Sequence, residues 1–279
     1  MRQSEALRIL EAGCPVFLTG APGSGKTYVL NRFIDSARQA GAHVAVTAST
    51  GIAATHINGR TIHSWSGVGV ATELTDSLLR TIRSRRRRKI QEADVLVIDE
   101  VSMMHAWLFD MVDRVCRALR HSSDPFGGLQ VVLSGDFFQL PPVTRAHGNV
   151  HDPSRDPEYA RYAEEGRDPD GFITESLVWD ELSPVVCYLD EQHRQDDGRL
   201  LGVLTDIRRG LVDDDDRMAL GRRVGMSPDE GVASVHLFPM NSQADSLNAL
   251  RLSQIEAGEH GFDARKTGPA DLVRQLTRN

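Results

Sequence analysis

The octapeptide GAPGSGKT at residues 20–27 combines residue types and a spacing that suit the binding of a nucleoside triphosphate. It fits the pattern G-x-x-x-x-G-K-[ST] and stands between an apolar run and a helix-like segment. Backbone N–H groups in such a loop form a nest for phosphate, and the following helix adds its positive end. A glycine-rich turn without a ligand is the alternative, which this spacing and context disfavour. We predict ATP binding by Gly20, Ala21, Pro22, Gly23, Ser24, Gly25, Lys26 and Thr27, with Lys26 at the β- and γ-phosphates and Thr27 on Mg²⁺.

A pair of acids follows the apolar run VLVI at residues 95–98. The run places Asp99 and Glu100 at the carboxyl end of a predicted strand, the edge at which α/β sheets bind ligands. We expect Asp99 to hold Mg²⁺ and Glu100 to polarise the attacking water. The alternative is that the two acids are simply solvated at the end of a strand. The phosphate loop argues against that alternative.

Two further side chains are candidates for contact with the γ-phosphate. Gln139 follows the next predicted strand in SGDFFQLPPV, where it can contact the γ-phosphate or its water. Arg194 in EQHRQ is a candidate cation for the charge of the transition state. Taken singly, Gln139 can be a polar turn residue, and an arginine such as Arg194 is more typical of a surface ion pair.

The elements that must position these residues can be recognised from apolar runs. The runs are continuous rather than alternating, which is typical of strands covered on both faces, so we predict a parallel sheet with flanking helices. Residues 28–41 have helical periodicity and complete a strand–loop–helix–strand unit. The predicted strands are PVFLT (15–19), HVAVTA (43–48), VLVIDE (95–100), LQVVLSGD (129–136) and PVVCYL (184–189).

The second half of the chain has weaker patterns. Residues 144–171 are rich in Pro, Gly, Asp and Arg and predict a surface excursion within the domain. Helical periodicity returns at residues 197–210 and 241–258, with one short strand candidate, SVHLF, at 234–238. No later strand is predicted.

Composition sets limits on the class of protein. The net charge of −7 over 279 residues argues against a protein coated with basic residues, although RSRRRRK (83–89) is strongly basic and DDDD (213–216) strongly acidic. Three scattered cysteines without metal-ligand spacing predict free thiols in a reducing cytoplasm. We find no signal peptide and no membrane span, and we expect a cytoplasmic protein, nucleoid-associated if bacterial.

Taken together in their order along the chain, the motifs resemble those of the Pif family of superfamily-one DNA helicases. RQSEAL resembles the adenine-reading Q motif, carried by Gln3. The other matching segments are GAPGSGKT, VTASTGIAATHINGRTIHS, VLVIDEVSMM, PFGGLQVVLSGDFFQLPPV and EQHRQ, and residues 109–130 look like the insert that distinguishes this family from RecD-type relatives. The resemblance implies a RecA-like P-loop NTPase lobe and an ATP- and Mg²⁺-dependent motor that moves 5′-to-3′ on single-stranded DNA.

The resemblance also implies a DNA-binding role for the segment that follows the second predicted strand. The residues expected to contact single-stranded DNA are Thr50, Gly51, Ala53, Ala54, His63 and Ser64. His63 or Trp65 is expected to stack on a base. A buried histidine satisfied by the backbone is the alternative for His63, and for RSRRRRK a DNA-tracking helix and a solvated basic helix remain open. Partners implied by the family are DNA junctions and single strands, with roles in DNA repair, recombination and telomere maintenance.

The carboxyl-terminal part departs from the family pattern. Nothing after Phe238 resembles the segments that complete a second motor lobe, so we expect a RecA-like lobe at 1–190 and an incomplete second lobe at 191–279. Either the chain is a fragment or the remainder of the motor comes from elsewhere, and the chain alone is expected to be impaired in unwinding. The alternatives are a RecD-like or relaxase-associated helicase, and a module that binds ATP and single-stranded DNA without translocating.

Overall fold

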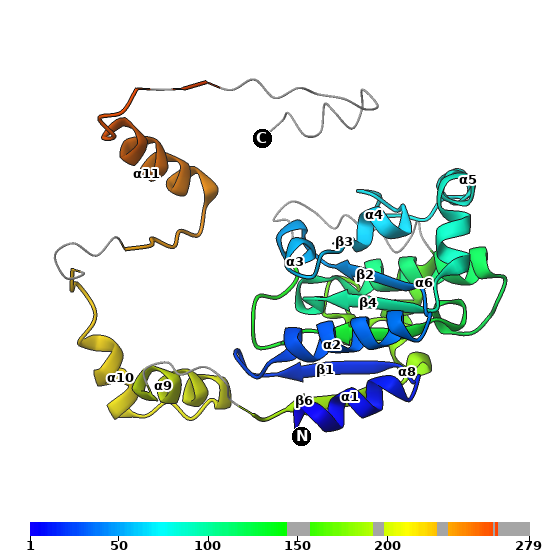
Figure 1. The fold of residues 1–279 in the computed structure, drawn as a ribbon, viewed down its shortest axis with the longest axis horizontal. Helices are drawn as coiled ribbons and strands as arrows, with labels where there is room; N and C mark the ends of the chain where they lie inside the picture. Colours follow the sequence, from blue (N-terminus) through cyan, green and yellow to red (C-terminus); the bar gives the residue numbers. More distant parts are fainter. Residues whose placement is uncertain (144–156, 192–197, 228–233, 259, 262–279) are drawn as a thin grey trace. The chain divides into compact units, whose positions relative to one another are not determined.

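The computed structural model describes residues 1–143, 157–191, 198–227, 234–258 and 260–261. They form two compact units whose boundary lies between Val212 and Asp213. The first unit is built on one sheet of six strands, all parallel, in the order β3-β2-β4-β5-β1-β6 (Figure 1). The strands are β1 (Val16–Gly20), β2 (Val44–Ala48), β3 (Arg60–Thr61), β4 (Val95–Asp99), β5 (Gln130–Ser134) and β6 (Val185–Leu189). The predicted parallel sheet with flanking helices is therefore confirmed.

Five of the six strands coincide with the predicted apolar runs to within two residues at either end. Only β3 escaped prediction, because two residues are too short to show a pattern. Residues 234–238, predicted as a strand, are not in one. Val235 is 89% exposed and Leu237 93% exposed, so this apolar run has no neighbouring strand or core to stabilise an extended pairing.

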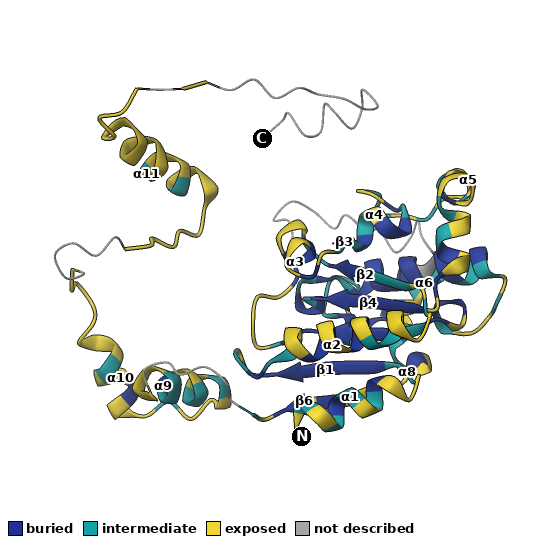
Figure 2. Cartoon of the chain, viewed as in Figure 1, coloured by how far each residue is buried: buried dark blue, intermediate teal, exposed yellow. Residues whose placement is uncertain are grey.

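Alternate residues of the central strands β1, β2, β4 and β5 face two separate cores. Val16 and Leu18 of β1 face one side, where they pack against α1 (Gln3–Glu11), α2 (Lys26–Gln39) and α3 (Gly51–His56). Phe17 faces the other side, which is covered by α4 (Ile62–Ser66), α5 (Asp76–Glu92), α6 (Ala106–Arg120) and α8 (Trp179–Leu182). The central strands are largely buried and the outer faces of the helices exposed, as Figure 2 shows, whereas Val186 and Tyr188 of the edge strand β6 are exposed. The continuous apolar runs of the central strands follow from this double covering.

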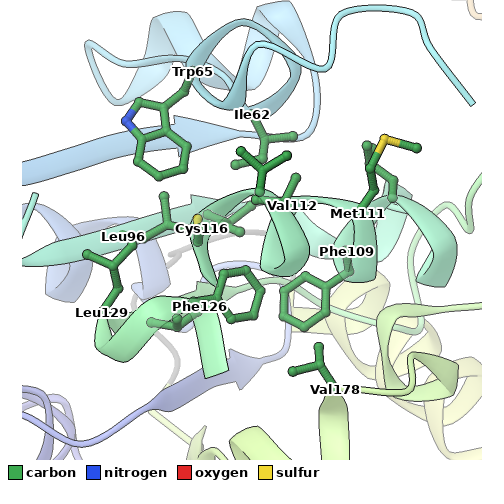
Figure 3. Close-up of a cluster of buried hydrophobic side chains, with 14 of the residues drawn as sticks. Ile62, Trp65, Leu96, Phe109, Met111, Val112, Cys116, Phe126, Leu129 and Val178 are labelled. Carbon is green, nitrogen blue, oxygen red and sulfur yellow. The ribbon is translucent and has the colours of Figure 1, made fainter. Parts of the chain in front are cut away.

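The family insert at residues 109–130 forms α6 and a short turn, η2 (Pro125–Gly128), which pack into the second core. Phe109 and Phe126 lie ring to ring there, with centroids 4.8 Å apart (Figure 3). The buried carboxylate of Asp113 accepts the Phe126 N–H at 2.6 Å. Arg120 donates to the backbone carbonyls of Gly127 and Ala93. The insert thus ties the loop before β5 to α5 and α6.

The described part of the predicted surface excursion at residues 144–171 contains a helix that sequence reasoning missed. Residues 157–164 form α7 (Pro157–Glu164), and its Tyr159 and Tyr162 are buried beside Ala106. The Tyr162 hydroxyl donates to Asp110, whose carboxylate also accepts the N–H groups of Leu177 and Val178. Two tyrosines in a polar segment are a weak sequence signal, but they provide enough apolar area to anchor a helix. The rest of the excursion, up to residue 156, lies outside the described residues.

The charge runs both form helix segments. RSRRRRK lies within α5, as the helical interpretation requires. DDDD begins α10 (Asp214–Gly221), where Asp213 and Asp216 accept each other's backbone N–H in a capping box. Acids at this end of a helix are stabilised by the free N–H groups and the dipole. The remaining described elements are η1 (Val101–Met103), η3 (Ile173–Glu175), α9 (Gly198–Arg209) and α11 (Asn241–Ser253).

Candidate nucleotide and DNA site

The glycine loop joins β1 to α2 at the carboxyl edge of the sheet. A Cβ atom at Gly20 would lie 2.6 Å from the carbonyl oxygen of Leu189 in β6 and 2.8 Å from the Ser24 hydroxyl. Gly25 precedes α2 with φ of +86°, a conformation that L side chains rarely adopt. Glycine is therefore needed at Gly20 to pass the neighbouring strand and at Gly25 to begin the helix.

The loop fits a bound triphosphate. As the first three residues of α2, Lys26, Thr27 and Tyr28 have N–H groups without intrahelical acceptors. The buried Ser24 hydroxyl has no hydrogen-bond partner in the described structure. The Lys26 ammonium folds over the loop and donates to the carbonyls of Gly20 at 2.8 Å and Ala21 at 3.3 Å. Burial lowers the pKa of Lys26, opposed by the charges of Asp136 and Glu100, so a phosphate here would meet a poorly hydrated cation.

Asp99 and Glu100 stand at the end of β4, as predicted. Burial raises the pKa of both carboxyls, and the charge of Asp99 raises the pKa of Glu100 further. Glu100 has φ of +53°, which is uncommon for a residue with a side chain and is typical of strained functional positions. Both features favour a nearby cation, because a buried acidic pair is stabilised by positive charge.

Ser49 connects this acidic pair to the segment after β2. Its hydroxyl donates to the Glu100 carbonyl at 2.6 Å, and its N–H donates to the Asp99 carbonyl at 3.1 Å. The expected DNA-contacting residues begin at the next position, Thr50. The nucleotide and DNA candidates are thus joined through two hydrogen bonds from Ser49 to backbone carbonyls.

Gln3 contacts the glycine loop from α1. Its side-chain amide donates to the Ser24 carbonyl at 3.1 Å, and its N–H donates to Glu191 at 3.0 Å. A residue near the amino terminus therefore lies against the nucleotide loop, which is the placement that an adenine-reading role requires.

Gln139 is attached to a buried acid that sequence reasoning missed, Asp136. The Gln139 amide donates to the Asp136 carboxylate at 3.1 Å, and its own N–H donates to the Asp136 carbonyl at 2.9 Å. Arg208 of α9 donates to both carboxylate oxygens of Asp136, at 2.7 and 2.6 Å, and lies over the Phe138 ring at 4.4 Å. Although burial opposes ionisation, the hydrogen bonds from Arg208 and Gln139 hold the pKa of Asp136 below its ordinary value. In the sequence, the only sign of the contact between Arg208 and Asp136 is the pair of arginines at the end of α9.

Replacing Arg208 with methionine should destabilise the first unit by about 3 kcal/mol at neutral pH, because a buried carboxylate loses its ion-pair partner. The folded-state pKa of Asp136 lies below its unfolded value, so this stabilisation exists above the unfolded pKa and is lost as pH falls. The difference from wild type should shrink below about pH 4. Urea unfolding at several pH values would measure it. Arg209→Met, at the exposed neighbour, is the control, and an equal loss in both variants would contradict the assignment.

The expected DNA residues lie on α3, α4 and the turns before them. The Thr50 hydroxyl caps α3 by accepting the Ala53 N–H at 3.2 Å, and Gly51 is exposed. Ala53 and Ala54 are buried against β2, so their side chains hold α3 on the sheet and only their backbone faces outward. On α4, His63 is half-buried and Ser64 exposed. Burial, with a smaller effect from His105, lowers the pKa of His63, which keeps its ring neutral at pH 7.

One expected base contact is wrong. Trp65 is 1% exposed and packs with Ile62 and Leu96 in the second core (Figure 3), so it cannot stack on a base. Helical spacing explains the error: Ile62, Trp65 and Ser66 lie on the inner side of α4, whereas Ser64 lies on the outer side. Arg194, the other expected γ-phosphate contact, lies outside the described residues.

A known protein family matches the part of the chain that holds these motifs. The model of the PIF1-like helicase family matches residues 4–154, which hold the glycine loop, the acidic pair and the Gln139 segment. The chain belongs to the PIF1-like helicase family.

Individual members of the family match along almost the whole chain. It is 38% identical to the ATP-dependent DNA helicase Pif1 of Psychrobacter sp. (strain PRwf-1) over 288 residues, covering 100% of this chain and 41% of that protein. It is 32% identical to human ATP-dependent DNA helicase PIF1 over 272 residues, covering 96% of this chain and 38% of that protein. The chain therefore spans about two fifths of the length of these relatives.

Solved structures show the same fold. Pif1 helicase from Candida albicans superimposes with a TM-score of 0.79 at 30% identity, over 99% of this chain and 60% of that chain. Bacteroides Pif1 bound to single-stranded DNA superimposes with a TM-score of 0.70 at 25% identity, over 96% of this chain and 60% of that chain. A RecA-like lobe for the first unit is thereby confirmed. Among the described helices, none is long and apolar enough to cross a membrane.

Proposed function

We propose that the chain carries the ATP-hydrolysing part of a DNA helicase that moves 5′-to-3′ on single-stranded DNA. The observation that carries this proposal is the linkage of two candidate sites through Ser49, whose hydrogen bonds join the acidic pair to the segment of Thr50. Bacteroides Pif1, a relative of the same fold, has been solved with ADP-AlF3 and single-stranded DNA. A shift of the backbone at Asp99 and Glu100 can reach the DNA segment through these hydrogen bonds.

Each residue of the site has a distinct role in ATP hydrolysis. The glycine loop and Lys26 bind phosphate, and Thr27 and Asp99 hold Mg²⁺, which supplies Lewis-acid stabilisation of the transferred phosphoryl group. Glu100 orients and deprotonates the attacking water, and its raised pKa makes it a better base than an ordinary carboxylate. Gln139 senses the γ-phosphate, Gln3 reads the adenine, and Arg194 completes the positive charge at the transition state.

We also propose the wider role and organisation that the family implies. The partners are single-stranded DNA and DNA junctions, and the roles are in DNA repair, recombination and telomere or genome maintenance. The functional lobes divide at residue 190, with 191–279 contributing to a second lobe. The compact unit extends further, to Val212, because Arg208 of α9 reaches Asp136 of the first lobe. We place the protein in the cytoplasm, or at the nucleoid in a bacterium.

The proposal predicts that His63→Ala weakens binding of single-stranded DNA without affecting ATP. Loss of one base or phosphate contact should raise the Kd for an oligothymidylate by roughly 5- to 100-fold. Because the His63 ring is neutral, the affinity should not depend on histidine titration between pH 7 and 8. Fluorescence anisotropy of labelled DNA and of a labelled ATP analogue would measure both affinities, and ATPase assays with and without DNA would test coupling.

His121→Asn is the matched control, since it removes a distant histidine and asparagine tolerates the positive φ at that position. An unchanged DNA affinity in His63→Ala, or DNA binding that does not weaken with salt, would refute this surface. If DNA does not change the ATPase activity of the wild-type chain, the coupling between DNA binding and ATP hydrolysis is refuted.

A further inference from the structure

A cavity of about 580 Å³ opens on the first unit, away from the nucleotide site. Its lining includes His43, which precedes β2, and Ala93, which precedes β4, so it lies at the amino edge of the sheet. The glycine loop and the acidic pair lie at the carboxyl edge, and a five-residue strand separates the edges by about 16 Å. We call this cavity the basic pocket. It is separate from the nucleotide site described above.

Positive charge dominates the rim of the basic pocket. Glu92 is the one acid in its lining, and it is engaged by Arg88 at 2.7 Å. Burial lowers the pKa of Lys89 to about 8, and the neighbouring charges of Arg60 and Arg86 add to this effect. Within the described residues, Arg38, Arg85 and Lys89 have no recorded ion-pair partner. The cations of the lining are Arg38, Arg85, Arg88 and Lys89, with His43 beside them.

The inner wall of the basic pocket is apolar and contains one unused donor. Val44, Ala45 and Ala93 line it together with Trp65. The Trp65 indole N–H is buried and has no hydrogen-bond partner in the described structure. In Figure 3 this nitrogen lies on the side of the ring away from Ile62 and Val112. An unsatisfied buried donor is costly, and an acceptor oxygen in the pocket would offset that cost.

These observations point to an oxyanion as the ligand. Three arginines and Lys89 lie beside an apolar wall, which strengthens their attraction for phosphate because it lowers the local dielectric. The indole N–H adds a neutral donor. Four of the six arginines of α5, Arg80, Arg83, Arg86 and Arg87, are absent from the lining of this pocket, so the helix contributes Arg85, Arg88 and Lys89 to it.

We propose that the basic pocket binds backbone phosphates of double-stranded DNA, as a second DNA contact on the opposite edge of the lobe from the single-strand surface. The choice of DNA rests on the proposed function, whereas the preference for phosphate rests on the pocket alone. The single strand is assigned to the carboxyl edge, so the amino edge is available to a duplex arm of the same substrate. The basic pocket thus accounts for RSRRRRK as a phosphate-binding helix.

The test compares two double variants on the same helix. Arg85→Ala with Lys89→Ala removes two cations of the basic pocket, whereas Arg83→Ala with Arg87→Ala removes two cations of α5 that do not line it. Binding of a blunt duplex to the full chain is measured by anisotropy over a range of salt. The pocket variant should bind roughly 10- to 100-fold more weakly, and its slope of log K against log salt should fall by about two. The control variant should stay within about threefold of wild type.

A third variant, Trp65→Phe, keeps an aromatic ring and removes only the donor. It should weaken duplex binding about threefold or more, while thermal unfolding shows that the fold persists. Equal losses in the two double variants would overturn the proposal, because general basic charge would then explain binding. Displacement of the duplex by a mononucleotide at equal concentration would also overturn it in favour of a small-molecule site. Failure of the proposed function would be seen separately, as a defect in the binding of ATP or of single-stranded DNA. The variants described here should not cause such a defect.

Discussion

Replacing Lys26 with alanine should abolish detectable ATP turnover and weaken ATP binding by roughly 10- to 150-fold. The side chain is the one cation inside the glycine loop, and a charge-assisted contact with phosphate contributes about 1.5–3 kcal/mol. Its present acceptors, the carbonyls of Gly20 and Ala21, show that the ammonium already lies over the loop. Binding of a labelled ATP analogue and release of phosphate would measure the two effects.

Arg32→Ala is the matched control for this prediction, because Arg32 is an exposed cation of the same helix, near Tyr28. It should leave both quantities near wild type. An unchanged ATP affinity in Lys26→Ala would remove the nucleotide site from this loop. Loss of the fold would not be mistaken for loss of the site, since thermal unfolding is measured on the same samples.

Replacing Glu100 with glutamine should lower the rate of ATP hydrolysis by about 10²- to 10⁴-fold while ATP still binds. Glutamine keeps the shape of the side chain and removes its basicity. The lost charge also relieves repulsion with Asp99, the neighbour that raises the pKa of Glu100, so ATP affinity should be equal or slightly higher. Single-turnover hydrolysis and equilibrium binding separate these effects.

The pH dependence gives a second measure of the same residue. The base must be deprotonated, so the rate should rise as pH rises through the pKa of Glu100, which lies above the ordinary carboxyl value. That acid limb should disappear in Glu100→Gln. Glu92→Gln, at an exposed acid of α5, should retain it. Equal loss of ATP binding in Glu100→Gln and Lys26→Ala would show that the roles of the two residues are misassigned.

Much of the nucleotide site could be predicted because its chemistry is local in the chain. The glycine loop, Lys26 and Thr27 are contiguous, and their conformation depends on backbone geometry within eight residues. Asp99 and Glu100 follow an apolar run whose burial on both faces is visible as continuous hydrophobicity. Parallel strands end at one edge of the sheet, so predicting the strands was enough to bring the loop and the acids together.

Other features depend on contacts between distant segments and have no local signature. The pairing of Arg208 with Asp136 joins positions 72 residues apart, and neither segment shows in its sequence which residue it will contact. Trp65 was misjudged because a helix of five residues is too short for its periodicity to show which side faces the core. The buried tyrosines of α7 were missed because the segment around them is polar and shows no apolar pattern.

The amino-acid sequence by itself determined the phosphate loop, the acidic pair, the parallel sheet and the family, because each depends on residue types at short, ordered spacings. Only the tertiary structure decided which arginines of α5 line the basic pocket. It also decided that the Gln139 segment is held by Asp136 and Arg208, and that 234–238 is not a strand. These outcomes depend on which surfaces pack against each other in the folded chain. A buried contact requires two residues that are far apart in the sequence, so neither residue alone predicts it.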